Sequence, residues 1–310
     1  MSDDTEDQWL FRLANLNVDR DHGDGKGVAP HKPLLLLAVI EMIGDRHLEE
    51  PNLEFTAELV YRFLNFWPIV EPRRKNHGDM RLPFHALGPQ RDRVWSATLT
   101  ADGKISNSRD TTKLIVINDE LWKCLQSPTF RQQAKSVLVA TYFTPLEQVA
   151  LSEACGIPLP HGIDVSALKK RAADYEESLN AGRCANFRRS IVVGYYFQCA
   201  LTGYSFTTTS GLHLVEAAHI RPLKKGGPNV PENGLALTPN SHWLLDKGMW
   251  TVDEQLRIVV ASSIHFKELG SSPEFYLQSR HGQPLILDRR SMTVPAETYL
   301  AYHRKHIFVG

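Results

Sequence analysis

The sequence predicts an α+β protein, with a helix-rich N-terminal part and a C-terminal part in which two strands precede a helix. Apolar residues in the first part recur mostly at the spacing of a helix face. The second part instead alternates short strand-like segments with loops rich in glycine and proline. The chain has 310 residues, a length typical of about two domains.

Helices and a small number of strands are expected in the N-terminal part. Pro33 suits the first position of a helix, and Gly44 ends that helix. Residues 93–99 alternate like a strand, and 114–117 form a short apolar strand. A basic loop is expected at 72–79. The expected helices are 7–16, 33–43, 53–66 and 119–142, the last interrupted by Pro128.

The loop at 156–162 suggests a domain boundary. We therefore expect a first domain at 1–155, a linker with a charged helix at 156–180, and a second domain at 181–310. The elements expected after the linker are a helix from 186, a strand at 212–220, a loop at 226–231, a helix at 240–247 that ends at Gly248, and a strand or hairpin at 250–260.

Composition excludes several classes of protein. With 42% hydrophobic and 23% charged residues and no net charge, the chain is neither disordered nor a histone-like coating protein. The apolar run at 33–40 is shorter than the roughly 18 residues of a membrane span. The acidic N-terminus is unlike a leader, so we expect a soluble, cytoplasmic protein. The four cysteines form no CxxC pair, which argues against a disulfide framework or a four-thiolate zinc site.

Four polar residues of the C-terminal part could form one chemical site. His242 and Asp246 are four residues apart on the expected helix, so both side chains lie on one face and could bind one ion. An imidazole and a carboxylate suit Mg²⁺, Mn²⁺ or Zn²⁺. His219, on the preceding strand, could remove a proton from water at neutral pH. Asn233 could hold the tautomer of that imidazole or tie down its own loop.

Three blocks that contain these residues resemble the HNH, or ββα-metal, nuclease motif. They are 216–222 (EAAHIRP), 233–237 (NGLAL) and 242–248 (HWLLDKG), and 199–203 resembles the lead-in of the restriction-type branch. The resemblance covers about 183–260 and implies an endonuclease. In it His219 is the general base, Asn233 the orienting residue, and His242 with Asp246 the ligands of a divalent metal, Mg²⁺ or Mn²⁺ before Zn²⁺.

The sequence departs from this motif directly before the base. Many HNH enzymes have an Asp or His there, as a further metal ligand, where this chain has Ala218. Glu216 is the nearest replacement, although on an ideal strand it faces away from His219. We therefore expect fewer protein ligands and more water or phosphate oxygens around the ion.

Two short segments of the N-terminal part, 29–36 and 81–87, resemble the sulfur-binding domain of McrA-like, phosphorothioate-dependent restriction endonucleases. The resemblance covers about 8–120 and implies a shallow apolar pocket around a sulfur of the DNA backbone. Such a pocket favours sulfur because sulfur is larger and less hydrated than oxygen. Leu82 replaces the usual aromatic residue, and Lys32 the usual arginine. The implied sulfur-binding residues are His31, Lys32, Leu82, Pro83, Ala86 and Arg109.

Four arginines could contact phosphates, although each could equally belong to a solvated surface. They are Arg73, Arg74, Arg81 and Arg221. Together these features predict a modification-dependent, type IV-like restriction endonuclease that binds phosphorothioated double-stranded DNA and cuts it nearby. Because one site of this kind cuts one strand, double-strand cleavage suggests a homodimer or two monomers acting together.

Two alternatives stay open. The same nuclease could read methylated or hydroxymethylated cytosine, which would need an aromatic cage for the flipped base. The candidate cage residues are Trp9, Phe63, Phe66, Trp67 and Phe84. The other alternative is a non-catalytic DNA-binding protein with a decayed nuclease fold, which Ala218 suggests.

Overall fold

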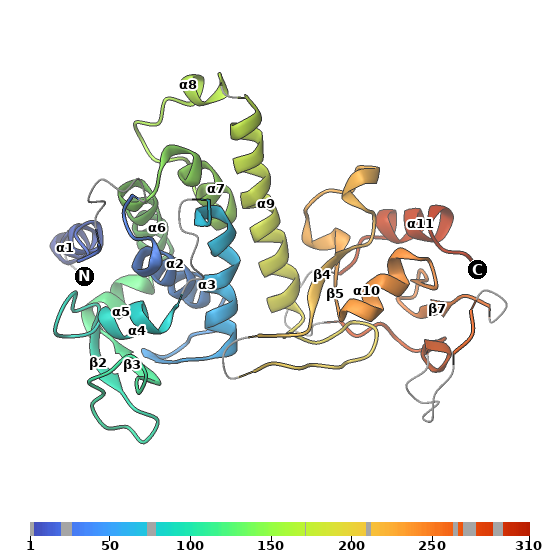
Figure 1. The fold of residues 1–310 in the computed structure, drawn as a ribbon, viewed down its shortest axis with the longest axis horizontal. Helices are drawn as coiled ribbons and strands as arrows, with labels where there is room; N and C mark the ends of the chain where they lie inside the picture. Colours follow the sequence, from blue (N-terminus) through green and yellow to red (C-terminus); the bar gives the residue numbers. More distant parts are fainter. Residues whose placement is uncertain are drawn as a thin grey trace. The chain divides into compact units, whose positions relative to one another are not determined.

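The computed structural model has an α+β fold and describes residues 3–19, 27–72, 79–170, 172–208, 212–262, 266–268, 277–287 and 294–310. The chain divides into two compact units, Met1–Asn186 and Phe187–Gly310 (Figure 1). Arg73 and Arg74, expected in the basic loop, lie outside the described residues. In the part of the chain that is described, no helix combines the length and the apolar character needed to cross a membrane.

The first unit is built around α2 (His31–Gly44), whose residues 32–43 are all buried. A helix without a polar face needs partners all round, and α3 (Ala57–Val70), α4 (Arg81–Ala86) and α6 (Pro128–Tyr142) pack against it. The remaining helices that are described here are α1 (Asp3–Ala14), α5 (Asp119–Leu125), α7 (Pro145–Cys155), α8 (Val165–Lys169) and α9 (Ala172–Gly194), which continues into the second unit.

A three-stranded antiparallel sheet of order β1-β3-β2 completes the first unit. It consists of β1 (Asn52–Glu54), β2 (Trp95–Leu99) and β3 (Leu114–Ile117). The helix predicted at 53–66 is wrong at its start, because Leu53 pairs with Ile115 in the sheet. The helix α3 begins only after Thr56, whose side chain accepts a hydrogen bond from the Leu59 amide at 3.2 Å.

The second unit contains two two-stranded antiparallel sheets and the helix α10. The strands β4 (Glu216–His219) and β5 (Gly234–Leu237) pair antiparallel, and α10 (Pro239–Asp246) packs beside them (Figure 1). The predicted hairpin at 250–260 is confirmed as β6 (Trp250–Val252) and β7 (Ile258–Val260). The strand expected at 212–220 is limited to Glu216–His219, the residues that pair with β5. The C-terminal α11 (Glu297–His306) packs on β6.

Candidate functional site

The pair β4–β5 and the helix α10 carry the histidines of the predicted nuclease site. His219 ends β4 and lies opposite Gly234 in the register of the two strands. Its ring stacks on Phe187, with 4.1 Å between the ring centroids and 14° between the planes. A Cβ at Gly234 would lie 2.4 Å from Ile191 Cδ1 and 2.8 Å from Phe187 Cε2, so only glycine fits beneath this stack.

A residue of the loop between β4 and β5 contacts a ring nitrogen of His219. Its Nε2 lies 2.8 Å from Oδ1 of Asn229. Burial lowers the pKa of His219 below its usual 6.5, although the hydrogen bond to Asn229 acts in the opposite direction. The charges of His242, which lowers this pKa, and Asp246, which raises it, act on the same ring. His219 is therefore neutral at pH 7 and able to accept a proton.

The predicted orienting residue, Asn233, is buried, and its side chain binds its own loop. Its Nδ2 donates to the carbonyls of Arg221 and Pro228, both at 3.0 Å, and its Oδ1 accepts from the Arg221 amide at 2.9 Å. Of the two roles considered for Asn233, these contacts correspond to tying down the loop. The residue that touches the imidazole, Asn229, was not singled out from the sequence.

The helix α10 brings His242 and Asp246 onto one face, as their spacing predicts. His242 Nε2 lies 3.7 Å from Oδ2 of Asp246, and His242 Nδ1 lies 2.7 Å from Oε1 of Glu216. Glu216 therefore reaches His242, although it lies three residues before His219 on β4. The imidazole stands between two carboxylates, and both of these are about half exposed.

These contacts fit a divalent ion held between His242 and Asp246. Ligand atoms at about 2.0–2.2 Å from one ion lie within about 4.4 Å of each other, and the 3.7 Å separation meets this limit. The Glu216 carboxylate accepts a hydrogen bond from Nδ1 of His242. This leaves the lone pair of the His242 ring on Nε2, the nitrogen next to Asp246. Within the described ranges, no cluster of three or more His, Cys, Asp or Glu side chains is suited to a metal.

Arg221, two residues after His219, makes its contacts within its own unit. Arg221 Nε donates to the carbonyl of Lys225 at 2.9 Å, and its guanidinium lies over the ring of Tyr302, 4.5 Å from the centroid. Lys225 and Tyr302 therefore hold the Arg221 side chain in place beside the loop whose Asn229 contacts His219.

In the first unit, the cation predicted to meet sulfur is used to hold the fold. Lys32 is buried, and its Nζ lies 2.5 Å from both Oδ2 of Asp92 and the carbonyl of Asn17. The neighbouring His31 packs its ring against Trp67, with centroids 5.0 Å apart. A buried cation paired in this way has no open face for a ligand, so the structure does not place Lys32 at a binding surface.

The second segment of the predicted sulfur site forms α4 and divides between the core and the surface. Pro83 and Ala86 are buried, whereas Leu82 is 48% exposed. Arg81 binds Asp79 at 2.9 Å and Asp110 at 3.4 Å, all on the surface. Arg109 is exposed in the loop before β3.

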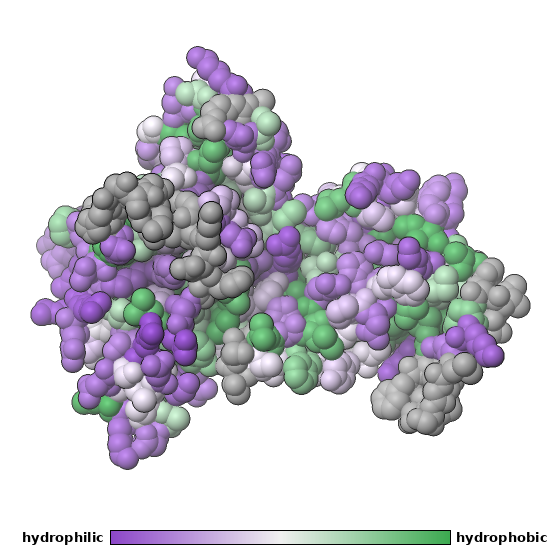
Figure 2. Space-filling view, viewed as in Figure 1, coloured by the Kyte–Doolittle hydropathy of each residue, from purple (hydrophilic) through white to green (hydrophobic). Residues whose placement is uncertain are grey.

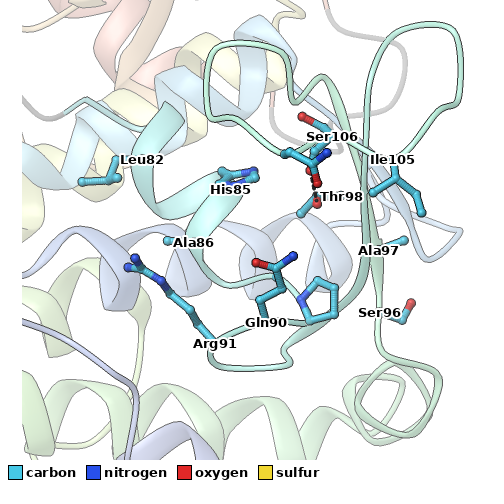
Figure 3. A pocket seen from close by; sticks show the side chains of 13 residues that line it. Leu82, His85, Ala86, Gln90, Arg91, Ser96, Ala97, Thr98, Ile105 and Ser106 are labelled. Carbon is cyan, nitrogen blue, oxygen red and sulfur yellow. Dashed lines mark hydrogen bonds between the residues drawn. The ribbon is translucent and has the colours of Figure 1, made fainter.

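A pocket of about 370 Å³ opens beside α4 (Figure 3). Leu82, His85 and Ala86 line it from α4, and Ala97 and Ile105 line it from β2 and the following hairpin. Its polar lining includes Gln90, Arg91, Ser96 and Asn107. Burial and the charge of Arg91 lower the pKa of His85, whose Nδ1 lies 2.8 Å from Thr112 Oγ1.

Apolar exposure in the first unit is concentrated at this pocket. Hydrophilic residues predominate on the face of this unit in Figure 2, with apolar residues scattered among them. Among its described residues the exposed large apolar side chains are Phe11, Leu82 at 48% and Ile105 at 77%, and the last two line the pocket. Sequence reasoning missed Ile105 and Arg91, because neither belongs to the two segments with a family resemblance.

Comparison with known proteins identifies a domain in the second unit. Residues 199–253 match the family described as HNH endonuclease, so the chain carries an HNH endonuclease domain there. Among solved structures, the chain resembles a modification dependent TagI restriction endonuclease, with 27% identity and a TM-score of 0.32. That likeness covers 40% of this chain and 38% of the other, so the chain spans well under half of that protein. Comparison with curated proteins gives no match.

Proposed function

We propose that the chain is a modification-dependent, type IV-like endonuclease of the cytoplasm that binds phosphorothioated double-stranded DNA through its first unit. The HNH domain then hydrolyses a nearby phosphodiester. The family match at 199–253 establishes the nuclease domain, and the choice of modified DNA as substrate is the proposal. Two copies acting together would cut both strands.

The observation that carries the choice of substrate is the pocket beside α4. It combines two exposed apolar side chains, Leu82 and Ile105, with the guanidinium of Arg91. A phosphorothioate keeps the negative charge of a phosphate but exchanges one oxygen for a larger, less hydrated sulfur. An apolar wall favours the sulfur because its dehydration costs less, while a guanidinium pairs with the remaining charge.

This assignment changes the cation expected from the sequence. Lys32 is paired with Asp92, and Asp92 follows Arg91 in the chain. Lys32 thus supports the segment that carries Arg91, while Arg91 itself lines the pocket. Of the residues that the family resemblance implies, Leu82 and Ala86 line the pocket. Lys32 is paired with Asp92, so we assign the pairing with the phosphorothioate charge to Arg91 instead.

Three side chains of the HNH domain take part directly in the proposed chemistry. His219, neutral at pH 7, takes the proton from the attacking water. His242 and Asp246 would hold the divalent ion, with His242 oriented by Glu216. Such an ion supplies stabilisation of the negative charge that develops on the phosphate and the leaving oxygen. Asn233 holds in place the loop whose Asn229 contacts His219.

The alternative substrate, a flipped modified cytosine, finds less support. Its aromatic cage would need accessible rings, but the candidate rings are buried in the core: Trp9, Phe63, Phe66, Trp67 and Phe84 are 0–4% exposed. A ring packed in a core cannot stack on a base without unfolding its surroundings.

Binding to matched duplexes tests the proposal. Ile105→Ser removes an apolar wall of the pocket, and Phe11→Ser removes the third exposed apolar side chain of this unit, which does not line the pocket. By fluorescence anisotropy, the wild type should prefer the phosphorothioated duplex. Ile105→Ser should reduce that preference about tenfold, the effect of about 1.4 kcal/mol, and Phe11→Ser should leave it unchanged. Equal binding of both duplexes by the wild type would refute the sulfur assignment.

A further inference from the structure

We propose that Asn229, which lies outside the three motif blocks, is the positioning residue that fixes the imidazole of His219 and presents its Nδ1 to the attacking water. This inference rests on the proposed function, in which His219 is the base. Asn229 Oδ1 lies 2.8 Å from His219 Nε2. Because an amide oxygen only accepts hydrogen bonds, Nε2 carries the proton and the lone pair is on Nδ1.

The stacking of His219 on Phe187 cannot make this selection by itself. A stack with 14° between the planes fixes the plane of the ring. However, a half-turn about the Cβ–Cγ bond leaves the ring in that same plane and exchanges its two edges. A directional hydrogen bond at Nε2 separates the two orientations. Phe187 and Asn229 together therefore determine both the plane and the edge of the imidazole.

The loop that carries Asn229 is held in place by Asn233. The Nδ2 group of Asn233 bridges the carbonyls of Arg221 and Pro228, immediately before Asn229. Gly227 is part of the same arrangement, since a Cβ there would lie 1.8 Å from the carbonyl oxygen of Arg221 and 2.8 Å from Asn233 Nδ2. Asn233 thus acts on the base indirectly: it shapes the loop, and the loop places Asn229.

A neutral amide suits this position better than a carboxylate would. When His219 takes a proton, the hydrogen bond from Nε2 to Asn229 stabilises the resulting imidazolium. The carboxylate of Asp246 already acts on this ring, and so does His242. A second negative charge beside the base would repel the phosphate of the substrate, whereas the amide orients the ring without that cost.

The experiment compares three variants of the full chain. Asn229→Ala removes the acceptor, Asn229→Asp keeps an acceptor of similar shape, and Gln255→Ala removes an exposed amide in the turn between β6 and β7 as a control. The first readout is the rate of DNA cleavage at saturating substrate. The second is the imidazole ¹H–¹⁵N spectrum of histidine-labelled, metal-free protein, which reports the ring proton of His219 without any reaction.

We expect a slowly exchanging Nε2 proton on His219 in the wild type, in Gln255→Ala and in Asn229→Asp. Asn229→Ala should lose this signal, and its cleavage rate should fall at least about tenfold. The fall should not exceed the roughly 10²–10⁴-fold that a general base contributes in full. Asn229→Asp should keep most of the rate at saturation, with weaker DNA binding.

An unchanged His219 spectrum in Asn229→Ala would overturn the inference, as would an Asn229→Ala rate equal to that of Gln255→Ala. Failure of the proposed function is recognised separately. In that case the wild type cleaves no DNA, whereas the spectrum still reports whether Asn229 sets the ring proton.

Discussion

A methyl group added at Gly234 should disturb the nuclease site through packing alone. The new Cβ would lie 2.4 Å from Ile191 Cδ1 and 2.8 Å from Phe187 Cε2, against 3.4–4 Å for ordinary contacts. Ile191 must therefore retreat by about 1 Å and Phe187 by about 0.6 Å in a close-packed interior. Overpacking of this kind costs about 1–3 kcal/mol. Because the ring of His219 stacks on Phe187, the imidazole proposed as the base moves as well, and misplacement by about 1 Å can cost about 10²-fold in rate.

Hydrogen exchange of the β4 and β5 amides measures the stability of this part of the fold, and DNA cleavage measures the rate. Gly234→Ala should lower the opening free energy of these amides by about 1–3 kcal/mol. Its cleavage rate should fall about 10–100-fold. The control is Gly44→Ala at the end of α2, where the nearest atom to a new Cβ is 3.8 Å away. Wild-type exchange and wild-type cleavage in Gly234→Ala would refute the argument that glycine is required beneath the stack.

Contacts of Lys32, Glu216 and His303 can be tested in the same way. Lys32→Met should lower the free energy of unfolding of the first unit, measured by urea denaturation, by about 3–5 kcal/mol, because it leaves the buried Asp92 carboxylate without its cation. A loss of sulfur preference at unchanged stability would contradict the structural role of Lys32. Glu216→Ala should weaken Mn²⁺ binding about 10–100-fold by calorimetry, because His242 loses the partner at Nδ1, and unchanged affinity would remove Glu216 from the site. Burial lowers the pKa of His303, so the unfolded chain binds more protons below pH 6.5, and stability should fall from pH 7.5 to pH 5.5; a midpoint in urea that is independent of pH would exclude this linkage.

Local sequence was sufficient to predict the elements that carry the nuclease residues. The i, i+4 spacing of His242 and Asp246 determines that they share a helix face, and α10 has them 3.7 Å apart. Asn229 could not be found in this way, because its contact with His219 depends on the path of a glycine- and proline-rich loop. The path of the loop is set by hydrogen bonds from Asn233 to the carbonyls of Arg221 and Pro228. Such contacts leave no periodic pattern in the sequence.

Long-range pairing accounts for contacts that the local sequence did not predict. Residue Lys32 follows a histidine in a motif-like segment and looks like an accessible cation, but its partner Asp92 is 60 residues away. The helix predicted from 53 fails for a similar reason, since Leu53 pairs with Ile115 and the same apolar residues suit a strand. In contrast, α7 was overlooked although a local signal was present: Thr144 and Glu147 form a capping box.

In the proposed function, one chain reads phosphorothioated DNA and cuts it with the HNH domain. The most direct test is cleavage of two plasmids of identical sequence, one phosphorothioated and one not, with Mg²⁺ or Mn²⁺ and with His219→Ala as control. We predict cleavage of the phosphorothioated plasmid alone, abolished in His219→Ala. Equal cleavage of both plasmids would contradict the assignment of the first unit as a sulfur reader, and cleavage that persists in His219→Ala would contradict the assignment of the base.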